Sequence, residues 1–161
     1  MSDRCRPEPA PGKLRQVLIF TAGGIECGVD IIIVQEIHEM VEVAPVTDAP
    51  SYVDGVVDLF GQSIPVVDIG TRLGIGSREY SKISRIVVVE VRSTLVGFIA
   101  DAVREVLSIP AHNFRRQGSG SGGIDGAYVE GLAEVGSRRI PVLDLEKVLL
   151  PDGAAPEWLE R

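Results

Sequence analysis

The chain has 161 residues, a length typical of one domain, and carries 16 Lys and Arg against 23 Asp and Glu, a net charge of −7. This acidic balance argues against a nucleic-acid-binding protein, which needs a basic face to displace counterions, and against a protein held on anionic lipid by charge. The 22 Val and 15 Ile residues, against 12 Leu, predict a β-rich protein, because β-branched side chains fit pleated sheets.

Membrane spans and disulfides are not expected. The longest aliphatic runs, Ile31–Val34 and Ile86–Val89, are far shorter than the roughly 20 apolar residues that a transmembrane helix needs. The first residues show no apolar segment typical of a signal peptide. Two cysteines, Cys5 and Cys27, make no disulfide framework, so a reducing cytoplasm is the expected location.

Both ends of the chain are predicted to be tails outside the domain. Residues 1–12 are polar and contain three prolines, which predicts a disordered lead-in. Residues 151–161 form a second tail, in which Trp158 is unusual for a solvated end. Two interpretations stay open for that ring: it packs back on the domain, or it belongs to a docking motif.

Between the tails the sequence repeats itself. Val53-Asp54-Gly55-Val56 matches Val129-Glu130-Gly131-Leu132, and the run from Ile64 to Ile69 matches the run from Ile140 to Leu145 at the same offset of 76 (129 − 53). Earlier parts match at an offset of 69 (105 − 36). At this offset glutamate, valine and glycine residues of the first half align with the same residue types in the second half. The repeat predicts one supersecondary unit occurring twice.

These units are expected over residues 13–78 and 82–150, as one small barrel each. Neither unit is large enough to bury much apolar surface alone, so the two are expected to share an interface. In the first unit, Val17–Phe20 predicts a buried strand, and Ala22–Gly24 turns the chain into a second strand over Ile25–Val29.

The rest of the first unit alternates caps, turns and strands. Asp30 is expected to cap a helical turn from Ile31 to Glu36, and Gly55 to end a short turn before the next strand. In that strand two apolar residues alternate with two that should point outward, and the outward residues are Asp58 and Phe60. After a turn at Gly61-Gln62-Ser63 and a strand over Ile64–Val67, Asp68 is expected to begin a short helix that ends near Gly74.

The second unit follows the same order. We expect strands over Ile86–Val91 and Leu95–Ile99, a helical turn near Asp101–Glu105, a hairpin over Ala127–Leu143 and a helix over Leu145–Leu150. Four or five short strands in each unit predict a mainly β fold of two small barrels with a few short helices.

No catalytic or metal-binding arrangement is visible. His38 and His112 are isolated, and no His-x-x-x-His or Cys-x-x-Cys spacing occurs. Cys27 has no neighbouring cation to activate a thiolate and is expected to be a small buried residue. Asp68 and Asp144 match in the repeat, but they lack the turn of an aspartic protease and are expected to be helix caps. We therefore predict no enzyme activity.

A glycine-rich stretch superficially suggests a phosphate site. Gly118-Ser119-Gly120-Ser121-Gly122-Gly123 follows two arginines but lacks the Gly-Lys-Ser/Thr and the helix of a Walker loop. A flexible surface loop is the better interpretation, and no cofactor is expected.

The ordered set of motifs resembles the CheW family of bacterial chemotaxis coupling proteins. In the first half the motifs are Val17-Leu18-Ile19-Phe20, Val34-Gln35-Glu36-Ile37, Ala49-Pro50-Ser51-Tyr52-Val53-Asp54-Gly55-Val56, Asp58-Leu59-Phe60-Gly61 and Ile64-Pro65-Val66-Val67-Asp68-Ile69. In the second half they are Gly97-Phe98-Ile99-Ala100-Asp101-Ala102-Val103 and Val129-Glu130-Gly131-Leu132. The resemblance covers nearly all of residues 13–150.

This resemblance implies two pseudo-symmetric, five-stranded SH3-like barrels and a non-enzymatic adaptor. Such adaptors link the cytoplasmic tip of methyl-accepting chemoreceptors to the regulatory domain of the histidine kinase CheA, which is itself CheW-like. The barrel surfaces are implied to contact the kinase domain, and the groove between the barrels to take the receptor helices. The residues expected to bind partners are Glu36, Ile37, Asp58, Phe60, Val103 and Glu105.

The chain departs from the usual family pattern at Phe60. The family usually shows Asn-Leu-Arg-Gly where this chain has Asp58-Leu59-Phe60-Gly61, and that arginine commonly pairs with the glutamate matching Glu36 and supports receptor binding. Three interpretations stay open. Receptor recognition is altered, or the chain is a divergent adaptor with another partner, or Phe60 packs under a loop and Glu36 is solvated.

Two other functions compete with a chemosensory scaffold. An adaptor of a related pathway, controlling surface motility or gene expression, fits the same residues. A tandem SH3-like nucleic-acid-binding protein is opposed by the charge of −7. The expected location is the cytoplasm, with recruitment to membrane-associated receptor arrays and no insertion into the membrane.

Overall fold

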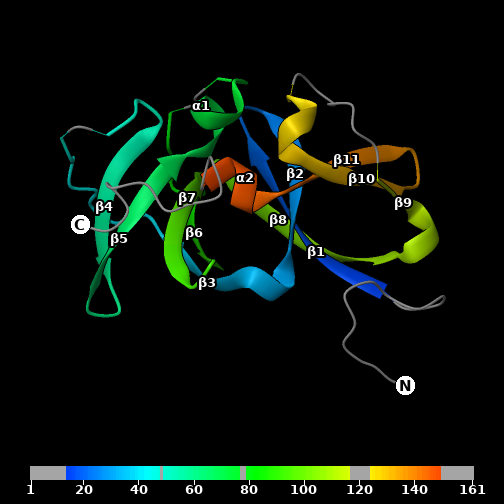
Figure 1. Ribbon diagram of the computed structural model, residues 1–161, viewed down its shortest axis with the longest axis horizontal. Coiled ribbons are helices and arrows are strands. Elements are labelled where there is room, and N and C mark those ends of the chain that lie inside the picture. Colours follow the sequence, from blue (N-terminus) through cyan, green and yellow to red (C-terminus); the bar gives the residue numbers. More distant parts are fainter. Residues whose placement is uncertain (1–13, 48, 77–78, 117–123, 150–161) are drawn as a thin grey trace.

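The computed structural model describes residues 14–47, 49–76, 79–116 and 124–149 (Figure 1). The two tails expected at 1–12 and 151–161, including Trp158, lie outside these residues, and so does the glycine-rich stretch 118–123. Among the described residues, no helix has the length and apolar character needed to cross a bilayer.

The first half follows the predicted order of elements. It contains β1 (Leu14–Ala22), β2 (Ile25–Asp30), the 3₁₀ turn η1 (Ile31–Ile33), β3 (Val34–Glu39), β4 (Val53–Leu59), β5 (Gln62–Asp68) and α1 (Ile69–Leu73). Asp30 caps η1 by accepting a hydrogen bond from the Ile32 amide, and Asp68 caps α1, which ends at Gly74, as predicted. The helical turn is shorter than predicted, because from Val34 the chain pairs with another strand instead of continuing to Glu36.

Gly55 lies inside β4 and not in a turn before it, contrary to the prediction. It occupies a bulge in the β4–β5 pairing with φ +147°, where a Cβ would come within 2.1 Å of the Ala44 carbonyl oxygen. Glycine is therefore required by the close approach of the two backbones.

The second half contains β6 (Arg85–Val91), β7 (Thr94–Ala100), β8 (Ala102–Pro110), η2 (Ala111–Asn113), β9 (Phe114–Arg115), η3 (Gly126–Tyr128), β10 (Val129–Val135), β11 (Arg138–Leu143) and α2 (Leu145–Leu149). The helical turn predicted near Asp101–Glu105 is wrong, because β8 is a nine-residue strand paired along β1. The Asp101 carboxylate accepts a hydrogen bond from the Gly24 amide at 3.2 Å.

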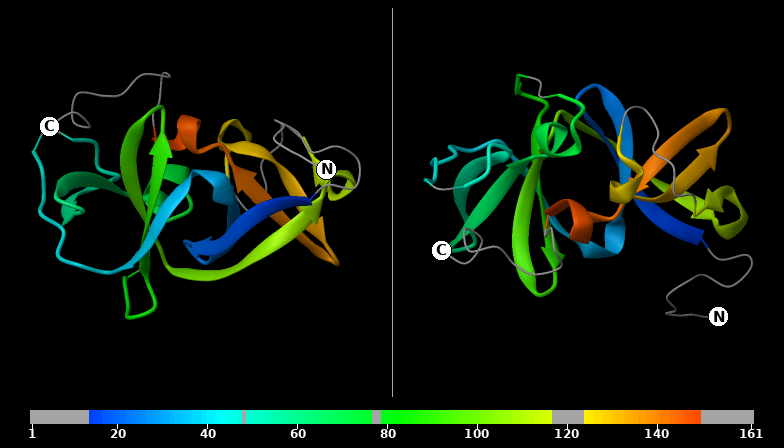
Figure 2. Two further views of the ribbon diagram at one scale, coloured as in Figure 1. Left: turned by 90° about the horizontal axis from the view of Figure 1, so that it is seen from below. Right: turned by 45° about the horizontal axis from the view of Figure 1, so that its top comes forward.

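The strands form two sheets, each built from both halves of the chain. The six-stranded sheet has the order β8-β1-β2-β11-β10-β9, and the five-stranded sheet has the order β3-β6-β7-β5-β4. The sheets therefore do not coincide with the ranges 13–78 and 82–150 that the repeat predicts for two barrels. Seen from below, β3 runs along the edge of the five-stranded sheet and β8 along the edge of the six-stranded sheet (Figure 2, left).

Alternate residues of the central strands serve different apolar clusters. Val17 and Ile19 of β1 lie in the cluster inside the six-stranded sheet, and Ile86 and Val88 of β6 lie in the cluster inside the five-stranded sheet. The residues between them, among them Leu18, belong to a third cluster shared by the two sheets. Burial on both faces explains why these strands are continuous apolar runs.

The shared cluster joins the sheets through two phenylalanines. Phe20 of β1 and Phe98 of β7 are both fully buried, and their ring centroids are 5.1 Å apart in a tilted arrangement. Aromatic pairs at this spacing are favourable beyond their buried area. The interface that the repeat predicted between two units is thus a continuous core.

Arg72 of α1 links the two halves at the edge of this core. Its Nε donates a hydrogen bond to the Val148 carbonyl at 2.7 Å, and its Nη1 donates one to the Tyr128 hydroxyl at 2.8 Å. The guanidinium also lies 4.8 Å from the ring centroid of Tyr52 and 4.9 Å from that of Tyr128. One cation therefore satisfies a carbonyl at the end of α2 and stacks on a tyrosine from each half.

Replacing Phe98 should test the shared core. Phe98→Ala removes a fully buried ring between the sheets and should lower the free energy of unfolding by about 3–5 kcal/mol in urea denaturation. Ile32→Ala serves as the control, because the Ile32 side chain is 79% exposed and its loss should change stability by less than about 0.5 kcal/mol. Equal effects of the two substitutions would contradict the assignment of the core.

Candidate functional site

Phe60 lies at the tip of the β4–β5 hairpin and is 57% exposed. Strand β4 ends at Leu59, and Phe60 and Gly61 both have positive φ, +57° and +72°. Two consecutive left-handed residues are typical of a tight type I′ hairpin turn, in which the first position favours Asn or Gly. The ring does not pack under a loop, so that interpretation of Phe60 is wrong.

The flanking residues of the hairpin confirm the predicted alternation. Val57 and Leu59 are buried in the five-stranded sheet, whereas Asp58 is exposed. The Ser63 hydroxyl donates a 3.0 Å hydrogen bond to the Asp58 carboxylate across the hairpin. Asp58 and Phe60 are thus presented to solvent close together, one as an anion and one as an apolar ring.

Ile37 and Val103 lie on the edge strands of the two sheets. Ile37 of β3 is 39% exposed, and it pairs with Val87, which belongs to the shared cluster. Val103 of β8 is partly buried and packs directly against that cluster. Edge strands β3 and β8 therefore place apolar side chains beside the junction between the sheets.

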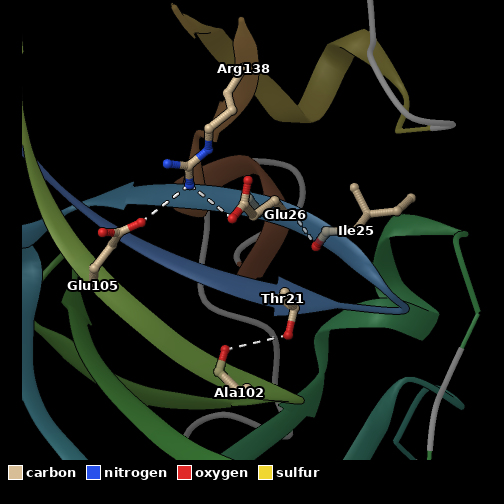
Figure 3. A network of polar contacts seen from close by, with 7 residues as sticks. Thr21, Ile25, Glu26, Ala102, Glu105 and Arg138 are labelled. Carbon is tan, nitrogen blue, oxygen red and sulfur yellow. Dashed lines mark hydrogen bonds and ion pairs between the residues drawn. The ribbon is translucent and has the colours of Figure 1, made fainter. Parts of the chain in front are cut away.

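The glutamates expected to bind partners, Glu36 and Glu105, have different surroundings. Glu105 of β8 accepts a hydrogen bond from Arg138 Nη2 at 3.2 Å, and Arg138 also donates to Glu26 of β2 at 2.9 Å (Figure 3). These hydrogen bonds raise the pKa of Arg138 above its ordinary value, and the one to Glu26 has the larger effect. Glu36 of β3 is half-buried and has no side-chain hydrogen bond or ion pair with the described part of the chain.

A groove of about 450 Å³ lies where η1, the end of β6 and the start of α2 meet. Its walls carry both positively and negatively charged side chains. Arg15 pairs with Glu130 at 2.7 Å and with Asp30 at 3.5 Å, and Arg92 pairs with Glu146. Because these charges are already paired within the chain, the groove shows no set of unpaired groups aimed at a small ligand.

Among the described residues, two features bear on covalent and metal chemistry. Burial raises the pKa of the Cys27 thiol to about 12, with smaller effects of Asp101 and Glu26, so the thiolate is not formed at neutral pH. Within 14–47, 49–76, 79–116 and 124–149, no three His, Cys, Asp or Glu side chains are grouped to hold a metal. His38 is part of β3, and His112 is part of η2.

Asp54 is a half-buried acid at the position of the repeat that Glu130 occupies in the second half. Its carboxylate accepts a 2.7 Å hydrogen bond from the Tyr80 hydroxyl. Burial raises the pKa of Asp54, the Tyr80 hydrogen bond lowers it, and the charge of Asp68 raises it, with a net rise. The ionised form is therefore less favourable here than in an unfolded chain.

Sequence reasoning missed Arg138 and Arg72, although both link distant parts of the chain. The repeat held a signal for Arg138: at the offset of 76 it corresponds to Gln62 (138 − 62), so the two halves differ in charge there. Nothing in the sequence pattern indicated that Arg72 stacks between Tyr52 and Tyr128.

Comparisons with known proteins give one consistent result. Residues 16–150 match the family profile of the CheW-like domain. The chain is 30% identical to the chemotaxis protein CheW of Klebsiella aerogenes over 84% of this chain and 81% of that protein, and 30% identical to CheW of Rhizobium meliloti over 83% and 86%.

The crystal structure of the scaffolding protein TtCheW from Thermoanaerobacter tengcongensis has the same fold. The match has a TM-score of 0.82 and 31% identity, and it covers 89% of this chain and 98% of that chain. The chain belongs to the CheW family. The mainly β fold predicted from the CheW resemblance is thereby confirmed, and two curled sheets are consistent with the two barrels of a CheW-like domain.

The Phe60 turn predicts an unusual mutational result. Phe60→Asn removes no buried contact and suits the left-handed backbone, so the free energy of unfolding should stay equal or rise by up to about 1 kcal/mol in thermal denaturation. Leu59→Ala, next to it but buried, should cost about 2–4 kcal/mol. A loss above about 2 kcal/mol for Phe60→Asn would show that the ring packs within the folded chain.

Asp54 predicts a pH-dependent difference in stability. Because its pKa is raised in the folded state, the ionised carboxylate disfavours folding at neutral pH, and this cost disappears as pH falls towards the ordinary pKa of Asp. Asp54→Asn keeps an acceptor for Tyr80 without the charge. The variant should be at least as stable as the native chain at about pH 7, and its advantage should shrink towards about pH 4.

Denaturant unfolding at a series of pH values measures this difference. An advantage of Asp54→Asn that grows on acidification would contradict the raised pKa of Asp54.

Proposed function

We propose that this chain is an adaptor that couples chemoreceptors to a CheA-type histidine kinase in chemosensory signalling. The observation that carries the proposal is the family match along residues 16–150. Buried Cys27 and the lack of a metal-ligand group in the described residues support a binding role over an enzymatic one. The adaptor is proposed to work in the cytoplasm, at the membrane-associated receptor arrays.

For the kinase, the proposed contact is a barrel surface. The regulatory domain of a CheA-type kinase is itself CheW-like by the resemblance above, so one sheet-based domain would meet another. The β4–β5 hairpin offers Phe60 and Asp58 to solvent, and an exposed aromatic ring is a favourable anchor for a protein contact.

For the receptor, the proposed contact is the junction between the two sheets. Ile37 on the edge strand β3 and Val106 on the edge strand β8 are 39% and 47% exposed, and they correspond to each other in the repeat. Apolar side chains on both sides of the junction suit the apolar stripe of a helix. Val103 packs beneath this surface.

A second candidate is a divergent adaptor of a related chemosensory pathway with altered receptor recognition. Phe60 favours it, since an apolar ring stands where the family commonly has an arginine. A nucleic-acid-binding role is disfavoured by the net charge of −7.

Calorimetric titration with the purified regulatory domain of the CheA-type kinase from the same organism tests the proposal. We expect a saturable complex with a dissociation constant in the micromolar range, weakened about tenfold by Phe60→Ala. Leu14→Ala is the matched control, because Leu14 is also exposed but lies on β1 of the other sheet. No heat and no complex at a kinase-domain concentration of about 100 µM would contradict kinase coupling.

A further inference from the structure

The edge strand β8 has a weak point where its pairing with β1 is interrupted. Within the described residues, β8 is the first strand of the six-stranded sheet and only β1 pairs with it. Glu105 lies opposite Ile19 and Val103 lies opposite Phe20, which leaves Arg104 without a partner on β1. A bulge of this kind interrupts the ladder of hydrogen bonds, and an edge strand has no second neighbour to compensate for the loss. We therefore expect β8 to open more easily here than a central strand.

The two faces of β8 carry different side chains at this bulge. Val103 and Val106 lie opposite two β1 residues of the shared cluster, so both valines are on the side of the junction between the sheets. Glu105 lies opposite Ile19, which belongs to the cluster inside the six-stranded sheet, so its side chain is on the other face. A group that holds Glu105 can thus fix the strand without covering the two valines.

Arg138 holds this other face of β8. Its Nη2 lies 2.9 Å from the Glu26 carboxylate of β2 and 3.2 Å from the Glu105 carboxylate, so that one guanidinium reaches from β11 to the edge strand (Figure 3). Close by, the Thr21 hydroxyl of β1 donates a 3.5 Å hydrogen bond to the Ala102 carbonyl of β8 (Figure 3). These side-chain contacts attach β8 to the sheet on both sides of the bulge.

The five-stranded sheet provides an internal comparison. Its edge strand β3 has a bulge next to Glu36, which corresponds to Glu105 in the repeat. Gln62 and Leu95 stand at the positions that correspond to Arg138 and Glu26. The arginine and one of its two carboxylate partners are therefore particular to the sheet that contains β8.

We propose that Arg138 is a positioning residue, which keeps β8 on its sheet by holding Glu105 and thereby fixes Val103 and Val106 at the junction between the sheets. This inference rests on the proposed function, in which the junction receives the receptor, and it adds how that surface is kept in place. Arg138 is assigned no contact with the receptor, because Glu105, its partner on β8, lies on the face away from the junction.

Hydrogen exchange of the backbone amides in the full chain tests whether Arg138 holds β8. At low salt, Arg138→Gln should speed the exchange of the β8 amides about fivefold and leave that of the β3 amides unchanged. The paired side chains are 34–44% exposed, so about 1 M NaCl should screen the ion pairs and shrink the difference between the variant and the native chain.

The matched control for exchange is Arg139→Gln. Arg139 is the next residue of β11, its side chain is 72% exposed, and it pairs with Glu134 of β10 at 3.7 Å. Its loss should leave the exchange of β8 unchanged. If Arg138→Gln does not speed the exchange of β8, or speeds that of β3 equally, Arg138 does not hold the edge strand and the proposal is wrong.

A binding experiment tests the consequence for the junction. The probe is the purified cytoplasmic signalling fragment of a chemoreceptor from the same organism. Arg138→Gln and Glu105→Gln should both weaken its binding about threefold at low salt, although they remove opposite charges. Direct electrostatic contacts with the fragment would make the two substitutions act in opposite directions. Arg138→Lys keeps the charge and should bind the fragment more tightly than Arg138→Gln does.

The outcomes separate this inference from the proposed function. If the fragment binds the native chain and Arg138→Gln equally well, or if Arg138→Gln and Glu105→Gln change the affinity in opposite directions, the inference is wrong and receptor coupling stands. If the fragment does not bind the native chain, receptor coupling is wrong, and with it the positioning of a receptor surface. The exchange experiment then still confirms or excludes that Arg138 holds β8.

Discussion

The apolar cluster shared by the two sheets holds the molecule together. Phe20 and Phe98 meet at its centre, one from each half of the sequence and one from each sheet. Because β1 and β2 complete the sheet of the second half, and β6 and β7 complete that of the first, neither half contains a whole sheet. Folding is thus expected to be a single cooperative event, with every surface used for binding positioned by this one core.

Pseudo-symmetry organises the surface around that core, and its exceptions mark specialised places. Tyr52 and Tyr128 are equivalent, and their carbonyls accept hydrogen bonds from the equivalent amides of Asp68 and Asp144. Arg72 breaks the symmetry, since a single guanidinium contacts both tyrosines. The ion pairs of Arg138 with Glu26 and Glu105 break it as well, because Gln62 and Leu95 stand at the equivalent positions of Arg138 and Glu26 in the other sheet.

This difference has a physical consequence for an adaptor. Charges that are paired within the chain, as in the Arg138 cluster, offer little gain to a partner. Two copies of one fold unit thereby provide two surfaces of different chemistry.

Much of the fold was predictable, because local signals agreed with it. Continuous runs such as Val17–Phe20 reflect burial on both faces, and Asp68 with Gly74 marked the limits of a helix correctly. The repeat also predicted the shared interface. The exchange of strands between the two halves was not predictable from the repeat. A repeat shows which strands are equivalent, but not whether a strand pairs within its own half or with the other half.

The candidate site was predictable only in part. Alternation predicted an exposed Phe60, but the reason is a left-handed turn residue after β4, which a period of two does not reveal. The strand β8 was mistaken for a helical turn because the second unit was expected to follow the first, in which a helical turn comes after the second strand, whereas eight residue pairs with β1 make this segment a strand. Arg138 was missed because its partners Glu26 and Glu105 lie on other strands, far apart in the sequence.

Isoleucine methyl signals offer the most direct test that the junction between the sheets is the adaptor's receptor-binding surface. With isoleucine methyl groups labelled, the chemoreceptor signalling fragment is titrated into the full chain and followed by NMR. The account predicts that the Ile37 signal on β3 shifts, whereas that of Ile75, which follows α1, stays in place. A shift of Ile75 without Ile37 on saturating binding would contradict it.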